Sequence, residues 1–385
     1  MRPDRTHATT LFREAFGKDP ARLAVVPGRV ELLGNHTDHN AGLVLAATID
    51  RTLEFAFAPR GDGNVELISS AFPGERIRFP ARNTRLDPDG RWANHVCAAL
   101  HESRRAGVPV GGFNAAVHST IPVGGGLSSS AALLVATALA VGGLPHRTAV
   151  ERLRVAELCQ RAERRLGVDC GLLDYLTILH GRAGAVLRLD CRSLTVRALP
   201  WPRDLALVLA DSGVRHQLAD GSYNAIRRAC AGAARKLGVP TLRELRSGSL
   251  SNMGTQLTPR ELAAARHVVD ENKRVAEAVR HLERDQSLLT SAATKGRLGE
   301  LFTASHESSR TQLRNSCPEL DALIDRASSL PGWLGGRLTG GGFGGMTVHV
   351  VRRHHARQFI DALPPECHAC GCRFQGGAVS NRPGA

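Results

Sequence analysis

The chain of 385 residues contains few aromatic side chains and no long apolar run. Phe, Trp and Tyr make up 4% of the sequence, which disfavours the exposed rings on which proteins stack single-stranded nucleic acid. The longest apolar stretch, 131–140, is shorter than the roughly 18 residues that span a membrane. The N-terminal residues also lack the apolar region of a secretion signal. We therefore expect a cytoplasmic protein with neither a nucleic-acid partner nor a membrane partner.

Positive charge dominates the chain, but it is not concentrated in one segment. The net charge is +14, and only four of the 50 basic residues are lysines. The arginines are scattered, and no run of five or six like charges forms a basic tail. We interpret the excess as ordinary solvated surface, whose field would also attract a polyanion such as MgATP.

The nine cysteines are an odd number, which favours reduced thiols in the cytoplasm over a disulfide framework. The run from Cys367 to Cys372 contains three of them and a histidine, so zinc is an alternative. Its ligands are crowded on an expected final strand and do not form the paired knuckles of a structural zinc site. We therefore expect free thiols there.

The length exceeds the usual range of one domain, about 100–200 residues, so we predict an α+β protein with two lobes, 1–195 and 196–385. The boundary is placed beside the Pro200-Trp-Pro202 punctuation. Alternating and buried-type apolar patterns predict strands within 24–58, 113–118, 185–189 and 205–210, and a strand–glycine loop–strand at 333–352. Amphipathic or apolar patterns predict helices at 131–141, 148–166, 172–179, 220–236, 258–283, 297–314 and 319–329.

The run Gly124-Gly-Gly-Leu-Ser-Ser-Ser130 lies between an expected strand and an expected helix. Three glycines allow the backbone to approach an oxygen closely, and successive N–H groups at a helix start form a site for an anion. A plain flexible turn with a serine N-cap is the alternative, but it needs only one glycine and one serine. This pattern therefore predicts a phosphate loop formed by Gly124, Gly125, Gly126, Leu127, Ser128, Ser129 and Ser130.

Two other nucleotide motifs are disfavoured. The sequence contains no Gly-Lys-Ser/Thr, so it has no P-loop of the common type. The run from Gly340 to Gly345 matches G-x-G-x-x-G, but no βαβ unit with a following acidic residue accompanies it. A dinucleotide oxidoreductase is therefore disfavoured.

Three glycine-containing stretches resemble the GHMP kinases, in the order that this family uses. They are Pro27–Asn40, Pro122–Ala132 and Gly336–Gly345. Further patches are similar to the galactokinase branch of that family: Cys159–Glu163, Cys170–Asp174, Ser222–Arg228 and Ser316–Asp321. The resemblance spans roughly residues 11–379. It implies a two-lobed GHMP-kinase architecture with the ATP site between the lobes.

The resemblance also implies roles for particular residues. Asp174 is similar to the catalytic aspartate that accepts the proton of the attacking sugar hydroxyl, and Arg29 to the arginine that pairs with it. Glu163 and Ser130 resemble the ligands of Mg²⁺, the expected cofactor beside ATP. Trp92 is similar to a tryptophan near the adenine. Without the resemblance, Asp174 and Arg29 would be interpreted as an ordinary surface carboxylate and strand-end arginine, and Glu163 as a surface residue of its helix.

The sugar site that the resemblance implies contains His36, Asp38, Gly171 and Tyr223, with Asp38 accepting from the 3- and 4-hydroxyls. Asn35 and His39 depart from the family, which has glutamate and tyrosine there; that glutamate would accept from the 6-hydroxyl. We therefore expect Asn35 to bind the sugar with relaxed selectivity at that hydroxyl. Tyr175 is a further departure, since the family has glutamine after its aspartate.

Taken together, the resemblance implies phosphoryl transfer from ATP to O1 of α-D-galactose. A 1-kinase for another galacto-configured sugar (N-acetylgalactosamine, arabinose or 6-deoxygalactose) and a non-catalytic galactose and ATP sensor are the alternatives. Small molecules are the expected partners. The oligomeric state is unknown, with a monomer favoured.

Overall fold

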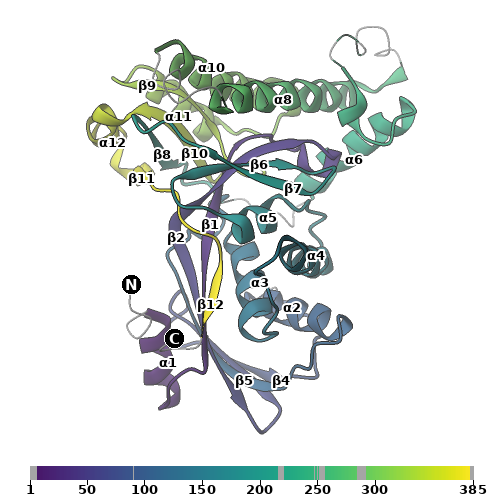
Figure 1. Ribbon diagram of the computed structural model, residues 1–385, viewed down its shortest axis with the longest axis vertical. Helices are drawn as coiled ribbons and strands as arrows, with labels where there is room; N and C mark the ends of the chain where they lie inside the picture. The colour runs from purple at the N-terminus through teal and green to yellow at the C-terminus, as the bar shows by residue number, and fades with distance from the viewer. Residues whose placement is uncertain are drawn as a thin grey trace.

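The computed structural model describes residues 7–89, 91–215, 221–246, 248, 250, 256–283 and 292–381. The described residues form two β-sheets with helices packed against them (Figure 1). The larger sheet has eight strands, with β12-β1-β2-β5-β3-β4 in order and the β6–β7 hairpin attached to β2. The smaller has the order β11-β8-β10-β9. This mixture confirms the predicted α+β class.

The larger sheet is built around two long antiparallel strands. These are β1 (Arg22–Leu33) and β2 (Leu43–Arg60), both rich in buried Val, Leu, Ala and Phe. The second half of β2 pairs with β5, and its first residues pair with β6. This one long strand therefore links the β6–β7 hairpin to the strands β5, β3 and β4. The other strands are β3 (Asn64–Ser69), β4 (Arg76–Pro80), β5 (Gly112–Ser119), β6 (Ala185–Asp190) and β7 (Thr195–Pro200).

Helices α2–α5 lie beside this sheet, and α1 packs near β5 and β2 (Figure 1). Helix α3 is the central one, because every residue from Ala131 to Ala140 is buried. A helix that is apolar on all sides belongs inside a core, and its position fixes its N-terminus at the end of the phosphate loop. The five helices are α1 (His7–Phe16), α2 (Ala93–Arg105), α3 (Ser129–Ala140), α4 (Ala149–Arg165) and α5 (Leu173–His180).

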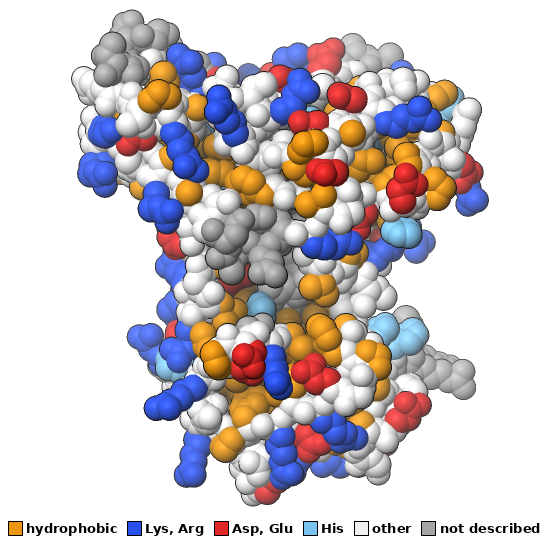
Figure 2. Space-filling model, turned by 180° about the vertical axis from the view of Figure 1, so that it is seen from behind, with side chains coloured by type: hydrophobic (Ala, Val, Ile, Leu, Met, Phe, Trp, Pro, Cys, Tyr) orange, Lys and Arg blue, Asp and Glu red, His pale blue; other side chains and the backbone are white. Residues whose placement is uncertain are grey.

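The smaller sheet and the remaining helices form the upper part of Figure 1. Its strands are β8 (Leu205–Asp211), β9 (Trp333–Leu338), β10 (Met346–Arg352) and β11 (Cys370–Cys372). The helices are α6 (Ser222–Lys236), α8 (Pro259–Glu283), α10 (Ala292–Ser308), α11 (Pro318–Ser328) and α12 (Ala356–Ala362). Figure 2 shows the molecule narrowing between its upper and lower parts.

Two predicted elements differ from the structure. The helix predicted over 297–314 ends at Ser308 and continues as one π-helical turn over Ser309–Leu313, which places Ser309 beside Asn35. The cysteine-rich strand β11 is not the last strand, because β12 (Val379–Asn381) follows and pairs with β1. Residue 195 is the first of β7, and the division into 1–195 and 196–385 remains a prediction.

Among the described residues, no helix is both long and apolar enough to cross a membrane. All nine cysteines lie in the described ranges and are free thiols.

Candidate active site

The phosphate loop connects β5 to α3 and packs against the glycine loop between β9 and β10. Gly126 has φ +76°, and a Cβ there would lie 2.7 Å from the carbonyl oxygen of Thr339. Gly340 approaches Gly126 from the other side, so neither position has space for a side chain. Two motifs more than two hundred residues apart therefore form one glycine-lined wall at the N-terminus of α3.

This wall borders a cavity of about 510 Å³ that contains most of the candidate residues. Its volume lies within the range of about 300–1,000 Å³ that is usual for small-molecule sites. The predicted site residues lining it are Arg29, Asn35, His36, Asp38, Trp92, Gly124, Gly126, Ser128, Ser129, Ser130, Glu163, Gly171, Asp174 and Tyr223. Of the predicted loop residues, Gly125 packs behind the wall against Gly345, and Leu127 has its side chain in the core.

Asp174, in the first turn of α5, lines the cavity and accepts hydrogen bonds from two side chains. Its Oδ1 accepts from Nε of Arg29 at 2.7 Å, and its Oδ2 accepts from Oγ of Ser128 at 2.7 Å. Arg29 is almost fully buried and also donates from Nη1 to the carbonyl of Gly126 at 2.5 Å. Ser128 has φ +65°, a strained value for a residue with a Cβ. This conformation accompanies a hydroxyl that faces Asp174 rather than capping α3.

Glu163, on α4, lies near the start of α3 and accepts from three side chains. Oγ of Ser130 donates to its Oε1 at 3.1 Å, while the Tyr175 hydroxyl and the Cys170 thiol both donate to its Oε2. Burial raises the pKa of Tyr175 well above its usual value, so this tyrosine stays a donor. Sequence analysis did not predict the contact between Tyr175 and Glu163. The two residues are twelve positions apart on different helices, and no sequence pattern indicates such a contact.

Hard oxygen donors of this kind fit Mg²⁺. One carboxylate and one hydroxyl form a partial shell, which nucleotide oxygens and water normally complete around this ion. Within the described part of the chain, no three His, Cys, Asp or Glu side chains gather as a metal site would need. The residues present therefore suit an ion that arrives with a phosphate, rather than one held by the protein alone.

The predicted sugar residues line the same cavity as Asp174 and contact one another. The His36 ring packs against the Tyr223 ring with centroids 4.9 Å apart, and a Cβ on Gly171 would overlap the Asp38 carboxylate. Burial lowers the pKa of His36 to about 3, so this ring is neutral. Burial raises the pKa of Asp38 to about 7, with the charges of Glu31 and Asp174 adding to the effect.

Asn35 and Glu31 form a second polar group in the same cavity. Nδ2 of Asn35 donates to Oε1 of Glu31 at 3.1 Å, and Nη1 of the buried Arg337 donates to the same oxygen at 2.9 Å. Burial raises the pKa of Glu31, and Arg337 opposes that effect. Sequence reasoning missed Glu31. The available signal was strand alternation, which puts residues 29 and 31 on one face of β1.

Trp92 lines the cavity beside a second aromatic residue, Phe72, which no sequence motif indicated. The rings of Phe72 and Trp92 are nearly parallel, at 3° between planes, and their centroids are 6.3 Å apart. Both line the cavity, and Phe72 is 43% exposed although it is a large apolar residue. Such a pair suits the flat face of a nucleotide base.

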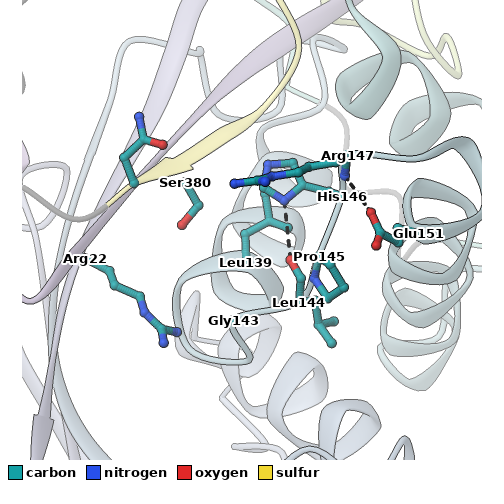
Figure 3. A pocket seen from close by; sticks show the side chains of 10 residues that line it. Arg22, Leu139, Gly143, Leu144, Pro145, His146, Arg147, Glu151 and Ser380 are labelled. Carbon is teal, nitrogen blue, oxygen red and sulfur yellow. Dashed lines mark hydrogen bonds between the residues drawn. The ribbon is translucent and has the colours of Figure 1, made fainter. Parts of the chain in front are cut away.

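A second cavity of about 470 Å³ lies at the other end of α3 (Figure 3). Its lining includes Arg22 of β1, Leu139 of α3, His146 and Ser380 of β12. None of the predicted site residues lines it. Because α3 has 12 residues, about 18 Å separates this cavity from the phosphate loop.

The charge on the surface follows the sequence-based interpretation. Lys and Arg side chains are spread over the whole face in Figure 2, with acidic and apolar side chains between them. Many arginines pair with carboxylates, as Arg60 does with Asp62 and Glu66.

Three family models match the chain. The galactokinase galactose-binding signature matches residues 10–59, the GHMP kinases N-terminal domain residues 93–182, and the GHMP kinases C-terminal model residues 289–369. The galactokinase of Chloroflexus aurantiacus is 38% identical over 91% of this chain and 89% of its own length. Human galactokinase is 39% identical over 89% of this chain and 87% of its own length.

Solved structures agree with these matches. The Lactococcus lactis galactokinase, crystallised with galactose, superposes with a TM-score of 0.87 at 27% identity, covering 96% of this chain and 98% of that one. The mevalonate kinase of Methanococcus jannaschii shares the fold at a TM-score of 0.64 and 18% identity, over 92% of this chain and 98% of that one. The chain belongs to the galactokinase family within the GHMP kinases, and it is an ATP-dependent sugar kinase.

Proposed function

We propose that this enzyme transfers the γ-phosphoryl group of ATP to O1 of α-D-galactose, with Asp174 as the general base. The observation that supports this most strongly is the position of Asp174. Its carboxylate accepts from Arg29 and from Ser128 of the phosphate loop, and it lines the same cavity as the residues predicted to bind the sugar. The galactose in the Lactococcus lactis relative supports the choice of sugar.

The arrangement of the chain's own residues suggests how the reaction proceeds. The Asp174 carboxylate accepts the proton of the 1-hydroxyl while that oxygen attacks the γ-phosphorus and ADP departs. Arg29, paired with Asp174, places a positive charge beside the transferring phosphoryl group. Loop N–H groups at Gly124 and Gly126 and the N-terminus of α3 bind the phosphates of ATP.

The metal is part of the same proposal. Glu163 and Ser130 would hold Mg²⁺, which supplies positive charge to the phosphates when it is bound. The Phe72–Trp92 pair would bind the adenine. The free thiols of all nine cysteines support a cytoplasmic location.

A substrate panel tests this proposal. The purified protein with MgATP should phosphorylate galactose faster than N-acetylgalactosamine, arabinose or glucose, and Asp174→Ala should abolish the activity. A non-catalytic sensor would instead bind galactose and ATP without releasing ADP. A preference for another sugar in the panel would replace galactose as the acceptor.

A further inference from the structure

The side-chain amide of Asn35 has no hydrogen-bonding capacity left for a ligand. Its Nδ2 donates to Oε1 of Glu31 at 3.1 Å and to the carbonyl of Gly340 at 2.8 Å. Its Oδ1 accepts from Nδ2 of Asn315 at 2.9 Å and from Oγ of Ser309 at 3.4 Å. An amide has two donor hydrogens and two acceptor positions, so all four are occupied. Asn35 therefore stabilises the wall of the cavity, and its amide has no free donor or acceptor for a sugar hydroxyl.

Glu31 is in the opposite situation. Both side-chain donors to Glu31, Asn35 and Arg337, bond to its Oε1, and no described residue donates to its Oε2. The side chain nevertheless lines the same cavity as Asp174 and Asp38. A carboxylate oxygen to which no protein group donates can accept from the hydroxyl of a ligand in that cavity.

The position of Glu31 matches one edge of a sugar ring. Glu31 lies two residues beyond Arg29 on β1, so the two side chains share a face and start about 7 Å apart. Arg29 marks the reacting end, where the 1-hydroxyl meets Asp174. Asp38 is close enough for the Glu31 charge to contribute to its raised pKa. Glu31, Asp38 and Asp174 therefore line one cavity and lie close enough for their charges to interact.

We propose that Glu31 is a specificity-determining residue, whose Oε2 accepts a hydrogen bond from the 6-hydroxyl of the sugar. With the 1-hydroxyl proposed to meet Asp174 and the 3- and 4-hydroxyls Asp38, the 2- and 6-hydroxyls remain. The 6-hydroxyl is favoured because Asn35, the position at which the resemblance puts its partner, donates to Glu31. This inference rests on galactose as the acceptor. It predicts the reverse of the expectation from Asn35 alone: 6-deoxygalactose is a poor substrate, because it leaves Oε2 unpaired.

Kinetic discrimination between galactose and 6-deoxygalactose tests the proposal. For the unmodified enzyme, we expect kcat/KM to be about 10- to 100-fold higher for galactose, as for other hydrogen bonds to a charged group. Glu31→Gln should reduce that ratio to within a few-fold, through a higher KM for galactose and little change for 6-deoxygalactose. The matched control is Glu300→Gln on α10, whose carboxylate is 64% exposed and far from this cavity in sequence and fold.

A second variant guards against loss of folding, because Glu31→Gln removes the charge that faces the buried Arg337. The exchange Glu31→Asn with Asn35→Glu keeps one carboxylate and one amide in the same polar group. We expect it to restore both the melting temperature and the preference for galactose. Melting curves of all variants identify those that are folded.

The outcomes separate this inference from the proposed function. If the unmodified enzyme phosphorylates no galactose, the proposed function fails. If it phosphorylates galactose and 6-deoxygalactose equally, or if folded Glu31→Gln keeps the full ratio, the assignment of Glu31 is overturned. If Glu31→Gln instead removes the discrimination against 2-deoxygalactose, Glu31 binds the 2-hydroxyl. The proposed assignment to the 6-hydroxyl is then wrong.

Discussion

Asp174 and Arg29 form an ion pair at 2.7 Å in the lining of the cavity, although 145 residues separate them in the sequence. Arg29 lies within a long buried strand, and Asp174 lies in the first turn of a short helix. The second oxygen of Asp174 accepts from Ser128, so the phosphate loop, the strand and the helix all meet at one carboxylate.

Replacing that carboxylate by its amide should remove the general base without changing its size. We expect Asp174→Asn to lower kcat by about 10²- to 10⁴-fold, the usual contribution of a general base, with little change in the KM for ATP. Steady-state kinetics at saturating galactose measure both constants. Asp361→Asn, a half-exposed carboxylate paired with Arg357 on α12, is the matched control. A kcat within tenfold of the unmodified enzyme would contradict the assignment.

Tyr175 should act on the metal through Glu163. Tyr175→Phe removes one of the two donors to Oε2 of this buried carboxylate, so we expect a loss of about 1–3 kcal/mol in the free energy of unfolding. We also expect weaker Mg²⁺ binding, since the carboxylate is no longer fixed. The concentration of Mg²⁺ at half-maximal rate and direct Mn²⁺ binding with a non-hydrolysable ATP analogue report the second effect.

Tyr175→Gln distinguishes orientation from packing, because an amide can still donate to Glu163. If Tyr175→Phe loses stability but binds Mn²⁺ as tightly as the unmodified protein does, Tyr175 has a packing role only.

The raised pKa of Asp38 predicts how sugar use depends on pH. Burial raises this pKa to about 7, and the neighbouring Glu31, Asp174, His39 and Arg227 complete its surroundings. Only the ionised carboxylate accepts from two hydroxyls. We therefore expect kcat/KM for galactose to rise about tenfold per pH unit below pH 7 and to level off above it. In Asp38→Asn, kcat/KM should not show this rise with pH. If the rise persists in Asp38→Asn, another group causes it.

The same pKa has a consequence for stability. The folded state binds the Asp38 proton between pH 3.8 and about 7, whereas the unfolded state has released it. Protonation therefore stabilises the fold below the unfolded pKa, and this contribution is lost as the pH rises towards 7. Asp38→Asn should gain stability relative to the unmodified protein as the pH is raised from 4 to 8. Chemical denaturation at several pH values measures the difference, and a constant difference would contradict it.

The Phe72–Trp92 pair should contribute to the binding of ATP and not to the binding of the sugar. Phe72→Ala leaves the base one aromatic face, so we expect the KM for ATP to rise about tenfold, with kcat and the KM for galactose nearly unchanged. ATP should also quench the fluorescence of Trp92, and Trp92→Phe should abolish that signal although Trp201 and Trp333 remain. Val150→Ala, at another exposed apolar residue, serves as the control. Unchanged ATP kinetics in Phe72→Ala would place the adenine elsewhere.

Much of the fold was readable because local patterns and tertiary packing agree. Alternating apolar residues mark β1, β2 and β5, and the capping box at Thr148 and Glu151 starts α4 where the amphipathic pattern predicts it. The π-helical turn after Ser308 could not be predicted, because its Ser309 contacts Asn35, a loop residue far away in the sequence.

The site was readable only where residues belong to motifs. Arg29, Asp174, Ser130 and Glu163 were found by resemblance, and the structure brings each pair within hydrogen-bonding distance. Glu31 and Phe72 were missed. Burial of Glu31 depends on Arg337, three hundred residues away, and Phe72 is opposed to Trp92 by a loop with no pattern of its own.

The central claim, transfer of the γ-phosphoryl group to O1 of galactose, is tested most directly by the identity of the product. Phosphorus NMR of a reaction with galactose and MgATP should show one sugar phosphate, whose phosphorus couples to the α-anomeric proton as ADP accumulates in equal amount. Phosphorus coupled to the protons at C6, or ADP formed without a sugar phosphate, would contradict it.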